Sequence, residues 1–247
     1  MGACGRVSAV CCVLWACAAF AELPPSACVP TMRPDRQWWS LSRHAEIISR
    51  LAQGEIRTNN VYDLVLVGDS ITHRWENPAN GASVYPKLKR RYRVLNLGCG
   101  GDQTQHVLWR LDHGALGQDY KYTARVFAVM IGVNNGEGDP EGVAQGVKLV
   151  LDRIRTAHPE SKIILMPILP CFQKPLLSVR QTVINPLIKK LADDETVFWL
   201  DFNDRFLGAD GEIKPGLMMP DKLHPIAAGY EIWLKALCPM VDKLIEK

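Results

Sequence analysis

The sequence predicts an α/β fold, a three-layer α/β/α sandwich built on a flavodoxin-like parallel sheet of five strands. Short apolar blocks alternate with longer segments of helical periodicity along most of the chain. Such blocks indicate strands buried on both faces, and their alternation with helices indicates parallel crossover units. Polar, glycine-bearing loops follow these strands, at the edge where open parallel sheets bind their ligands. At 247 residues, the chain fits one domain of ordinary size.

The first 21 residues are a different kind of sequence. An uncharged stretch over residues 7–20 follows Arg6 and ends in a small-x-small pattern at Ala21. This pattern is typical of a secretory signal peptide cleaved near Ala21, the alternative being a buried N-terminal helix. We therefore expect an exported chain with no transmembrane segment after cleavage. A faint match of residues 14–17 to a lipoprotein processing site makes a lipid anchor at Cys17 the less favoured alternative.

Charge and cysteine content exclude several classes of function. Without the signal peptide, 28 basic residues (29 minus Arg6) face 26 acidic ones, a balance that does not indicate nucleic-acid binding. No cysteine or histidine pair has metal-ligand spacing, so we expect neither a metal nor a cofactor. Export would permit a disulfide between Cys28 and Cys238, although the sequence leaves the pairing of these residues with Cys99 and Cys171 open.

The elements follow in order after a proline-rich, irregular lead-in over residues 22–37, which precedes the predicted hydrolase domain at 38–247. Helical periodicity starts at Trp38 and continues to residue 51, a polar turn is expected over 53–60, and the first strand over 61–67. The basic run 87–93 is interpreted as a solvated helix end. The later strands are expected at 94–97, 126–131, 162–166 and 197–200, and the later helices at 104–111, 141–157, 179–191 and 226–245.

Ser70 stands directly after the first strand, in the run GDSITHRW. The turn at Gly68 and the helix-capping residue types at Asp69 and Ser70 predict a strand-turn-helix that presents Ser70 at the sheet edge. A serine hydroxyl needs a base to act as a nucleophile. His224 is the candidate base, and Asp221, three residues earlier, can accept from its ring and orient it.

Acyl transfer through Ser70 would also require donors for an oxyanion. The backbone N–H of Ser70, the N–H of Gly101 and the side-chain amide of Asn134 are the candidates, because each follows a predicted strand. His73 and Trp75 are candidates for the border of the acyl pocket. Further possible pocket residues are Asp69, Asp102 and Asn135.

The glycines at positions 98, 100 and 101 also raise the question of dinucleotide binding. Gln103 occupies the position of the third glycine of that fingerprint, and no acidic residue ends a second strand about 20 residues later. A nucleotide-binding domain therefore remains only a third hypothesis, testable by thermal shift with NAD and ATP.

Taken together, these blocks resemble the SGNH, or GDSL-type, esterases and lipases. Residues 68–71 resemble the nucleophile block, 98–102 the glycine block of the oxyanion hole, 132–134 the asparagine block, and 221–224 the Asp-x-x-His block. The run 95–111 is similar to the platelet-activating-factor acetylhydrolase catalytic subunits and their secreted bacterial relatives. That branch often has Leu-Pro-Arg-Gly after the fourth strand, where this chain has Leu169, Pro170, Cys171 and Phe172.

The resemblance implies a serine esterase that hydrolyses acetyl esters with Ser70, His224 and Asp221. Export and the family analogy favour an acetylated glycan, or another small acetylated substrate, as the partner. The alternative enzyme is a phospholipid or platelet-activating-factor-type acetylhydrolase. A catalytically silent binding module is the hypothesis from another class, and the intact serine, histidine and aspartate argue against it. The sequence does not indicate an oligomeric state.

Overall fold

A parallel sheet of five strands, in the order β2-β1-β3-β4-β5, forms the centre of the protein. The computed structural model describes residues 24–34, 37–58, 60–135, 139–172 and 175–246, so the signal peptide predicted over residues 1–21 lies outside them and stays a prediction. The strand order is that of flavodoxin-like sheets, which confirms the predicted fold class. The strands are β1 (Val61–Gly68), β2 (Val94–Asn96), β3 (Thr123–Met130), β4 (Lys162–Leu165) and β5 (Val197–Trp199).

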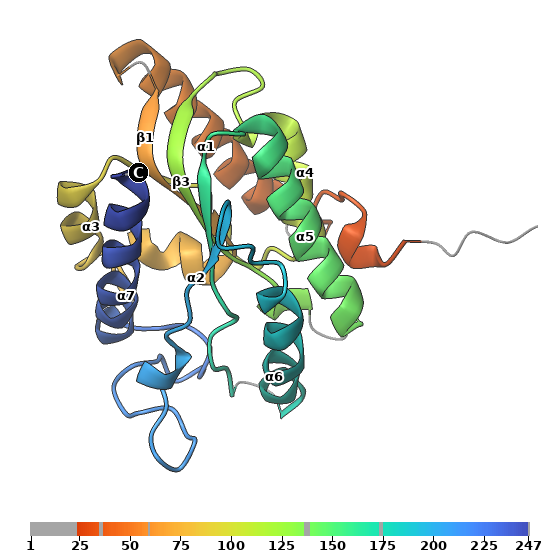
Figure 1. Cartoon of the computed structure of the whole chain (residues 1–247), viewed down its shortest axis with the longest axis vertical. Helices are drawn as coiled ribbons and strands as arrows, with labels where there is room; N and C mark the ends of the chain where they lie inside the picture. Colours follow the sequence, from red (N-terminus) through yellow and green to blue (C-terminus); the bar gives the residue numbers. More distant parts are fainter. Residues whose placement is uncertain (1–23, 35–36, 59, 136–138, 173–174, 247) are drawn as a thin grey trace, which may run out of the picture.

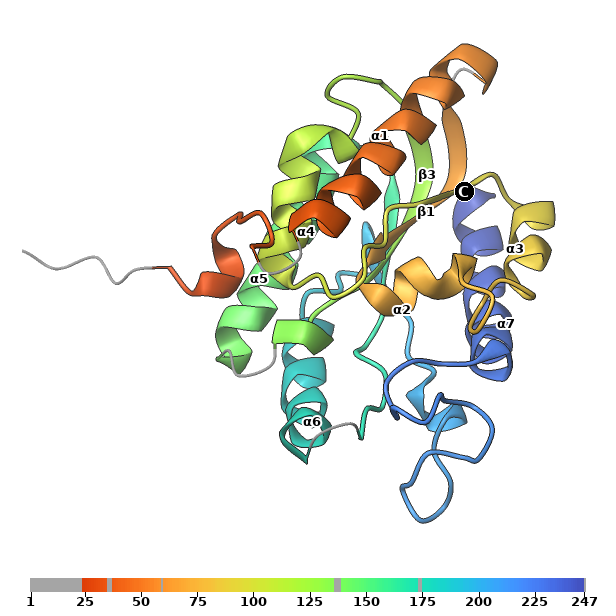
Figure 2. The same cartoon turned by 180° about the vertical axis from the view of Figure 1, so that it is seen from behind.

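Helices cover both faces of this sheet (Figure 1). Those of the described residues are α1 (Gln37–Thr58), α2 (Ser70–His73), α3 (Tyr85–Arg91), α4 (Thr104–Arg110), α5 (Pro140–Ala157), α6 (Pro175–Lys189) and α7 (Ala227–Ile245). Helices α3 and α7 lie on one face of the sheet, and α4 and α5 lie on the other. The connecting helices change face after β2, because β2 is added on one side of β1 and β3 on the other. Seen from behind, α1 lies beside α4 (Figure 2), where Arg110 donates to the carbonyl of Ser40 at 3.0 Å. Within the described ranges, no helix combines the length and the apolar character needed to cross a bilayer.

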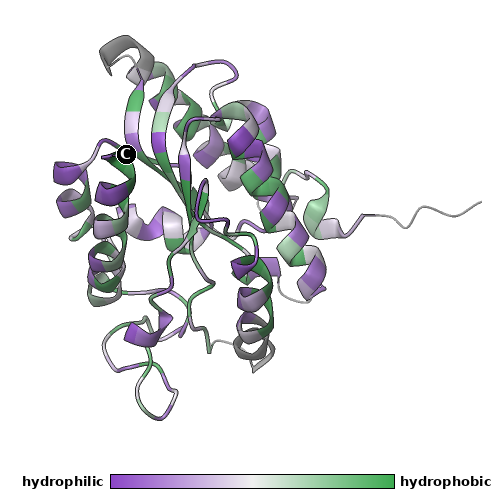
Figure 3. Cartoon of the chain, viewed as in Figure 1, coloured by the Kyte–Doolittle hydropathy of each residue, from purple (hydrophilic) through white to green (hydrophobic). Residues whose placement is uncertain are grey.

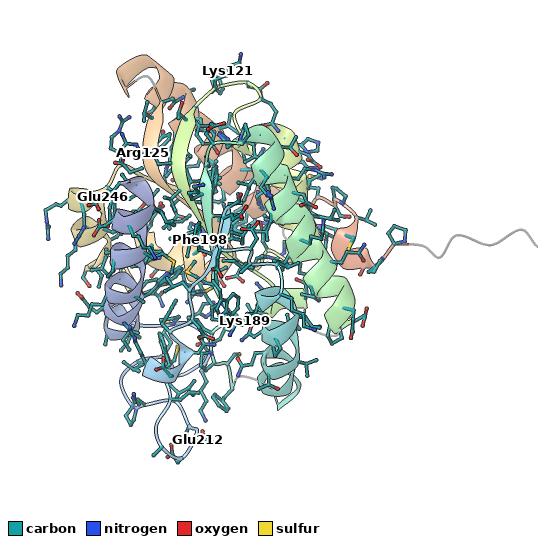
Figure 4. The ribbon with its side chains drawn as sticks, in the orientation of Figure 1. Lys121, Arg125, Lys189, Phe198, Glu212 and Glu246 are labelled. Atoms are coloured by element: carbon teal, nitrogen blue, oxygen red, sulfur yellow. The ribbon has the colours of Figure 1, made fainter. Side chains whose placement is uncertain are left out.

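The hydrophobic core lies between the sheet and these helices. The last five residues of β1 and of β3 are all buried, as the continuous apolar blocks predict for strands covered on both faces. Figure 3 shows apolar residues along the strands and polar residues on the outer sides of the helices. Charged side chains such as Lys121 and Glu212 project outward at opposite ends of the molecule (Figure 4).

The predicted polar turn over residues 53–60 is wrong, because α1 continues through most of it to Thr58. Asn60, two residues beyond this end, adopts a positive φ of 48°. Asparagine tolerates this left-handed conformation, which commonly terminates helices. Its side chain donates to the carbonyls of Leu51 at 2.9 Å and Lys121 at 3.0 Å, and a Cβ on Gly54 would lie only 2.1 Å from its Oδ1. The polar residues of this stretch therefore belong to the end of a helix, and the side chain of Asn60 holds that end in place.

The basic run at 87–93 was interpreted as a solvated helix end, and α3 confirms this. The helix ends at Arg91, and its last three residues, Lys89, Arg90 and Arg91, are exposed. Cationic side chains are favourable there because the helix dipole places partial negative charge at its C-terminus.

Cys28 and Cys238 do not form the disulfide that export would permit. Both are free and buried, as are Cys99 and Cys171. Cys28 packs on α5, with its thiol 3.6 Å from the carbonyl oxygen of Gly142. Cys238 belongs to α7, on the other face of the sheet, so the sheet itself separates the two thiols.

Trp75, a candidate for the border of the acyl pocket, lies in the core instead. It is 0% exposed, and its ring centroid is 4.7 Å from that of Tyr230 and 5.1 Å from that of Trp233. Trp75 follows α2, and both partners belong to α7. This aromatic cluster therefore joins the segment after β1 to the last helix.

We expect Trp75→Ala to lower the free energy of unfolding by about 3–5 kcal/mol, because it leaves a large cavity in a packed cluster. Urea unfolding followed by circular dichroism measures this loss. Trp38→Ala is the matched control, since Trp38 is 76% exposed and its removal should change stability by less than about 0.5 kcal/mol. Equal effects of the two substitutions would contradict the assignment of Trp75 to the core.

Candidate active site

Ser70 is the first residue of α2, directly beyond the carboxyl end of β1. The turn between strand and helix is tight, because a Cβ on Gly68 would lie 2.3 Å from both the carbonyl oxygen of Met130 and Oγ1 of Thr72. Asp69 caps the helix, its Oδ1 accepting from the N–H of Ile71 at 2.9 Å. The expected strand-turn-helix therefore forms, and Ser70 faces the pocket with 8% of its surface exposed.

His224 and Asp221 lie in the loop that precedes α7. Asp221 shapes this loop, because its Oδ1 accepts from the backbone N–H groups of Leu223 and His224, each at 3.0 Å. Its Oδ2 lies 2.6 Å from Nδ1 of His224, and Nε2 of His224 lies 2.8 Å from Oγ of Ser70. The three side chains form one continuous hydrogen-bonded chain from carboxylate to hydroxyl.

The pKa values of this chain favour a charged aspartate and a neutral histidine. Burial opposes the charge of Asp221, but the N–H groups and the imidazole that it binds outweigh burial and lower its pKa. Burial lowers the pKa of His224 below 6.5, Asp221 opposes this shift, and the positive charge of Arg74 adds to it. At neutral pH the ring is therefore a free base, with Nδ1–H donated to Asp221 and Nε2 facing Ser70.

Gly101 and Asn134 face the same pocket from two neighbouring loops. Gly101 follows β2 and has a φ of +72°, which favours glycine. Asn134 follows β3, in the short helix η4 (Val133–Asn135), and its Nδ2 donates to the carbonyl of Asp102 at 3.0 Å. Gln103 donates back to the carbonyl of Asn134 at 2.7 Å. The two loops are thus bonded to each other beside Ser70.

Asp102 ends the glycine-rich loop over residues 98–102 and anchors it through a buried ion pair. It is fully buried and makes a two-pronged ion pair with Arg110, at 2.6 Å and 3.1 Å. Although burial opposes the charge of Arg110, this pairing raises its pKa. The residue that caps α4 is Gln103, and Nδ1 of His106 accepts from its backbone N–H at 3.1 Å.

The possible pocket residues divide into two groups. His73 lines the pocket, and burial lowers its pKa to about 4, so it is neutral. Asp69, Asp102 and Asn135 are buried and make hydrogen bonds or ion pairs within the surrounding loops and helices. Asn135, for example, accepts from the N–H of Thr104 at 3.1 Å. These three residues do not line the pocket, and their hydrogen bonds hold the loops around it.

Several pocket residues were not singled out from the sequence. Trp39 of α1 lies against Gly100, and its ring centroid is 5.7 Å from that of His73. Arg33 of the lead-in donates to the carbonyl of Gly100 at 2.8 Å and lies over Gly101. Arg74 lines the pocket four residues after Ser70. Of these residues, only Arg74 could have been placed in the pocket from the sequence, because it follows Ser70 by four residues and such a pair shares one face of a helix.

The resulting pocket has a volume of about 550 Å³ and is bordered mainly by polar and charged side chains. Gly101, Asn134 and Arg33 also border a neighbouring cavity formed by the lead-in. Among the described residues, no three histidine, cysteine or carboxylate side chains are grouped as a metal ion would require.

Comparison with known proteins identifies the family to which this chain is similar. Residues 66–232 match the model of the GDSL-like lipase/acylhydrolase family. The chain is 35% identical over 190 residues to the platelet-activating factor acetylhydrolase IB subunit alpha2 of Homo sapiens, covering 75% of this chain and 78% of that protein.

Solved structures show the same fold. A putative acylhydrolase from Bacteroides fragilis superposes with a TM-score of 0.66 at 18% identity, over 84% of this chain and 98% of its own. An acetylxylan esterase from Geobacillus stearothermophilus superposes with a TM-score of 0.52 at 19% identity, over 76% of this chain and 96% of its own.

We expect the His224 ring to titrate with a midpoint below 6.5, because burial disfavours its charged form. Removing the carboxylate in Asp221→Asn should lower the midpoint further, since Asp221 favours the imidazolium. Proton NMR of the ring Cε1–H measures both values, with the resonance assigned by its loss in His224→Gln. A midpoint that rises in Asp221→Asn would show that the carboxylate does not stabilise the charged ring.

Proposed function

The chain belongs to the GDSL-like lipase/acylhydrolase family and is a carboxylic ester hydrolase; we propose that it hydrolyses acetyl esters of carbohydrate, with Ser70, His224 and Asp221 as its catalytic residues. The observation that carries this proposal is the position of His224, 2.8 Å from Oγ of Ser70 and 2.6 Å from Oδ2 of Asp221. These distances suit proton transfer between hydroxyl and ring without any rearrangement.

In the first half-reaction, Oγ of Ser70 attacks the ester carbonyl carbon while Nε2 of His224 takes the hydroxyl proton. The carbonyl π electrons move to oxygen and form a tetrahedral oxyanion. His224 then gives its proton to the departing alcohol oxygen, the carbon–oxygen bond breaks, and an acetyl-serine remains. Asp221 keeps the ring in the required tautomer and stabilises the imidazolium that forms between these two steps.

The oxyanion would be bound by three donors: the N–H of Ser70, the N–H of Gly101 and the amide of Asn134. Asn134 uses one amide proton on the carbonyl of Asp102, which fixes the amide and leaves its second proton for the oxyanion. Donors that are held in place before the reaction stabilise developing charge without reorganising.

In the second half-reaction, a water molecule takes the place of the alcohol. His224 accepts a proton from this water as its oxygen attacks the acetyl carbonyl, and a second oxyanion forms in the same place. Its collapse breaks the bond to Oγ, which recovers its proton from His224, and acetate leaves.

Two features of the pocket support a sugar rather than a lipid as the alcohol part of the substrate. Trp39 and His73 present neighbouring rings, 5.7 Å apart between centroids, on which the apolar face of a sugar can lie. Polar and charged side chains dominate the rest of the lining, which gives an alkyl chain little apolar surface. The alternative, a phospholipid-type acetylhydrolase, is favoured by the similarity to the acetylhydrolase subunit reported above.

We expect purified protein to hydrolyse p-nitrophenyl acetate, and Ser70→Ala and His224→Ala each to lower kcat by about four orders of magnitude or more, because the three residues act as a unit. Ser42→Ala and His113→Ala are matched controls on exposed positions and should retain activity. Retention of a tenth of the activity by folded Ser70→Ala would exclude Ser70 as the nucleophile.

We also expect acetate to be released faster from acetylated xylan or an O-acetylated sialate than from an acetylated ether phospholipid. Hydrolysis of p-nitrophenyl octanoate should be slower than that of the acetate, because the pocket offers a long chain few apolar contacts. Acetate release is measured enzymatically, with Ser70→Ala as the background. The reverse order in both comparisons would favour the lipid-type acetylhydrolase.

A further inference from the structure

Arg74 lies on the same helical face as Ser70. The four-residue helix α2 runs directly into η2 (Arg74–Glu76), and the N–H of Arg74 donates to the carbonyl of Ser70 across one turn. Side chains four residues apart on such a turn are neighbours. The guanidinium accordingly lines the same pocket as Ser70 and His224.

Four charged side chains close to Arg74, those of Arg43, Glu46, Arg50 and Glu76, are neutralised in pairs. Buried Arg43 donates to Glu46 at 2.9 Å and to Glu76 at 3.2 Å. Arg50 pairs with the same two carboxylates. This network holds two positive and two negative charges, so it contributes no net charge to the pocket. Burial also lowers the pKa values of His73 and His224, and both are neutral at pH 7.

Arg74 differs from these residues. Within the ranges that the structure describes, it makes no ion pair, and its guanidinium contacts only neutral acceptors: Asn80 Oδ1 and Met219 Sδ, both at 3.5 Å. A guanidinium has five N–H donors in a planar fork. A half-buried cation with so few partners, facing a substrate pocket, has the chemistry of a receptor for an anion.

We propose that Arg74 binds a carboxylate on the alcohol part of the substrate, so that the enzyme is selective for O-acetylated acidic sugars. This inference rests on the proposed function and refines its substrate class. A planar carboxylate can accept two parallel N–H bonds from the guanidinium. The adjacent ring pair of Trp39 and His73 favours a sugar as the carrier of that carboxylate over a phosphate-bearing lipid.

The test compares two substrates that differ only in the anionic group: a mono-O-acetylated methyl galacturonide and the matching mono-O-acetylated methyl galactoside. We expect the wild-type kcat/KM for the acidic sugar to exceed that for the neutral one by about tenfold or more, as for a hydrogen bond between charged partners. The ratio should fall to near one in Arg74→Gln and to an intermediate value in Arg74→Lys, which keeps the charge but loses the fork. Arg90→Gln removes an equal charge from an exposed site on α3 and should leave the ratio unchanged.

The assays are run at pH 8, where His224 is neutral in every variant. This choice matters because the charge of Arg74 lowers the pKa of His224, and its loss would otherwise change activity through the base. Equal wild-type rates for the two sugars, or a ratio that survives in Arg74→Gln, would overturn the inference. An acetylated ether phospholipid is the third substrate. If it is turned over faster than both sugars and this preference is lost in Arg74→Gln, the anion is a phosphate and the carboxylate assignment is wrong.

A binding measurement separates this inference from the esterase proposal. Calorimetry with the acidic sugar is carried out on Ser70→Ala and on Ser70→Ala combined with Arg74→Gln. About tenfold weaker binding in the double variant supports the role of Arg74, even if the wild type shows no esterase activity. Equal binding in the two proteins refutes that role, even if the esterase activity is present.

Discussion

The hydrogen bond from the hydroxyl of Tyr230 to the carbonyl of Ile71 holds the two halves of the site together. It spans 2.6 Å and is fully buried, and it joins α7 to the turn that carries Ser70. Burial raises the pKa of Tyr230, so the hydroxyl remains protonated and acts as a permanent donor. Asn80 makes a second connection by donating to the carbonyl of Pro225 at 2.7 Å, immediately after His224. Ser70 and His224 are 154 positions apart in the chain, and their 2.8 Å contact depends on these links.

Close packing of the loops at the carboxyl edge imposes a second constraint. A Cβ on Gly98 would lie 2.4 Å from the backbone nitrogen of His73, so only glycine lets the loop after β2 approach the helix after β1. Buried Arg43 donates to the carbonyl of Gly98 at 3.0 Å and to that of Asn96 at 3.1 Å, which holds this loop against α1. The donors proposed for the oxyanion are therefore fixed by backbone contacts that leave little room for motion.

The sheet and the positions of Ser70, Asp221 and His224 could be predicted because they follow from local pattern and topology. Apolar blocks define parallel strands, and parallel strands deliver their following loops to one edge. Trp75 was misplaced because helical spacing does not tell which side of a short turn faces the core. The polar stretch before Asn60 was wrongly predicted to be a turn. The side chain of Asn60 bonds to the carbonyl of Lys121, which is distant in the sequence, so local pattern could not show this contact. The role proposed for Arg74 depends on which neighbouring charges are paired, and only the folded chain shows these pairs.

That charge balance also links substrate binding to proton transfer. The positive charge of Arg74 disfavours the imidazolium form of His224 and so weakens this ring as a base. A carboxylate that pairs with Arg74, as proposed, would cancel this effect, because the pair presents no net charge to the ring. The pKa of His224 would then be higher in the complex than in the free enzyme, and the imidazolium that forms as Ser70 attacks would be more stable. An acidic substrate would thus strengthen the base that acts on it, whereas a neutral ester would meet the weaker base of the free enzyme.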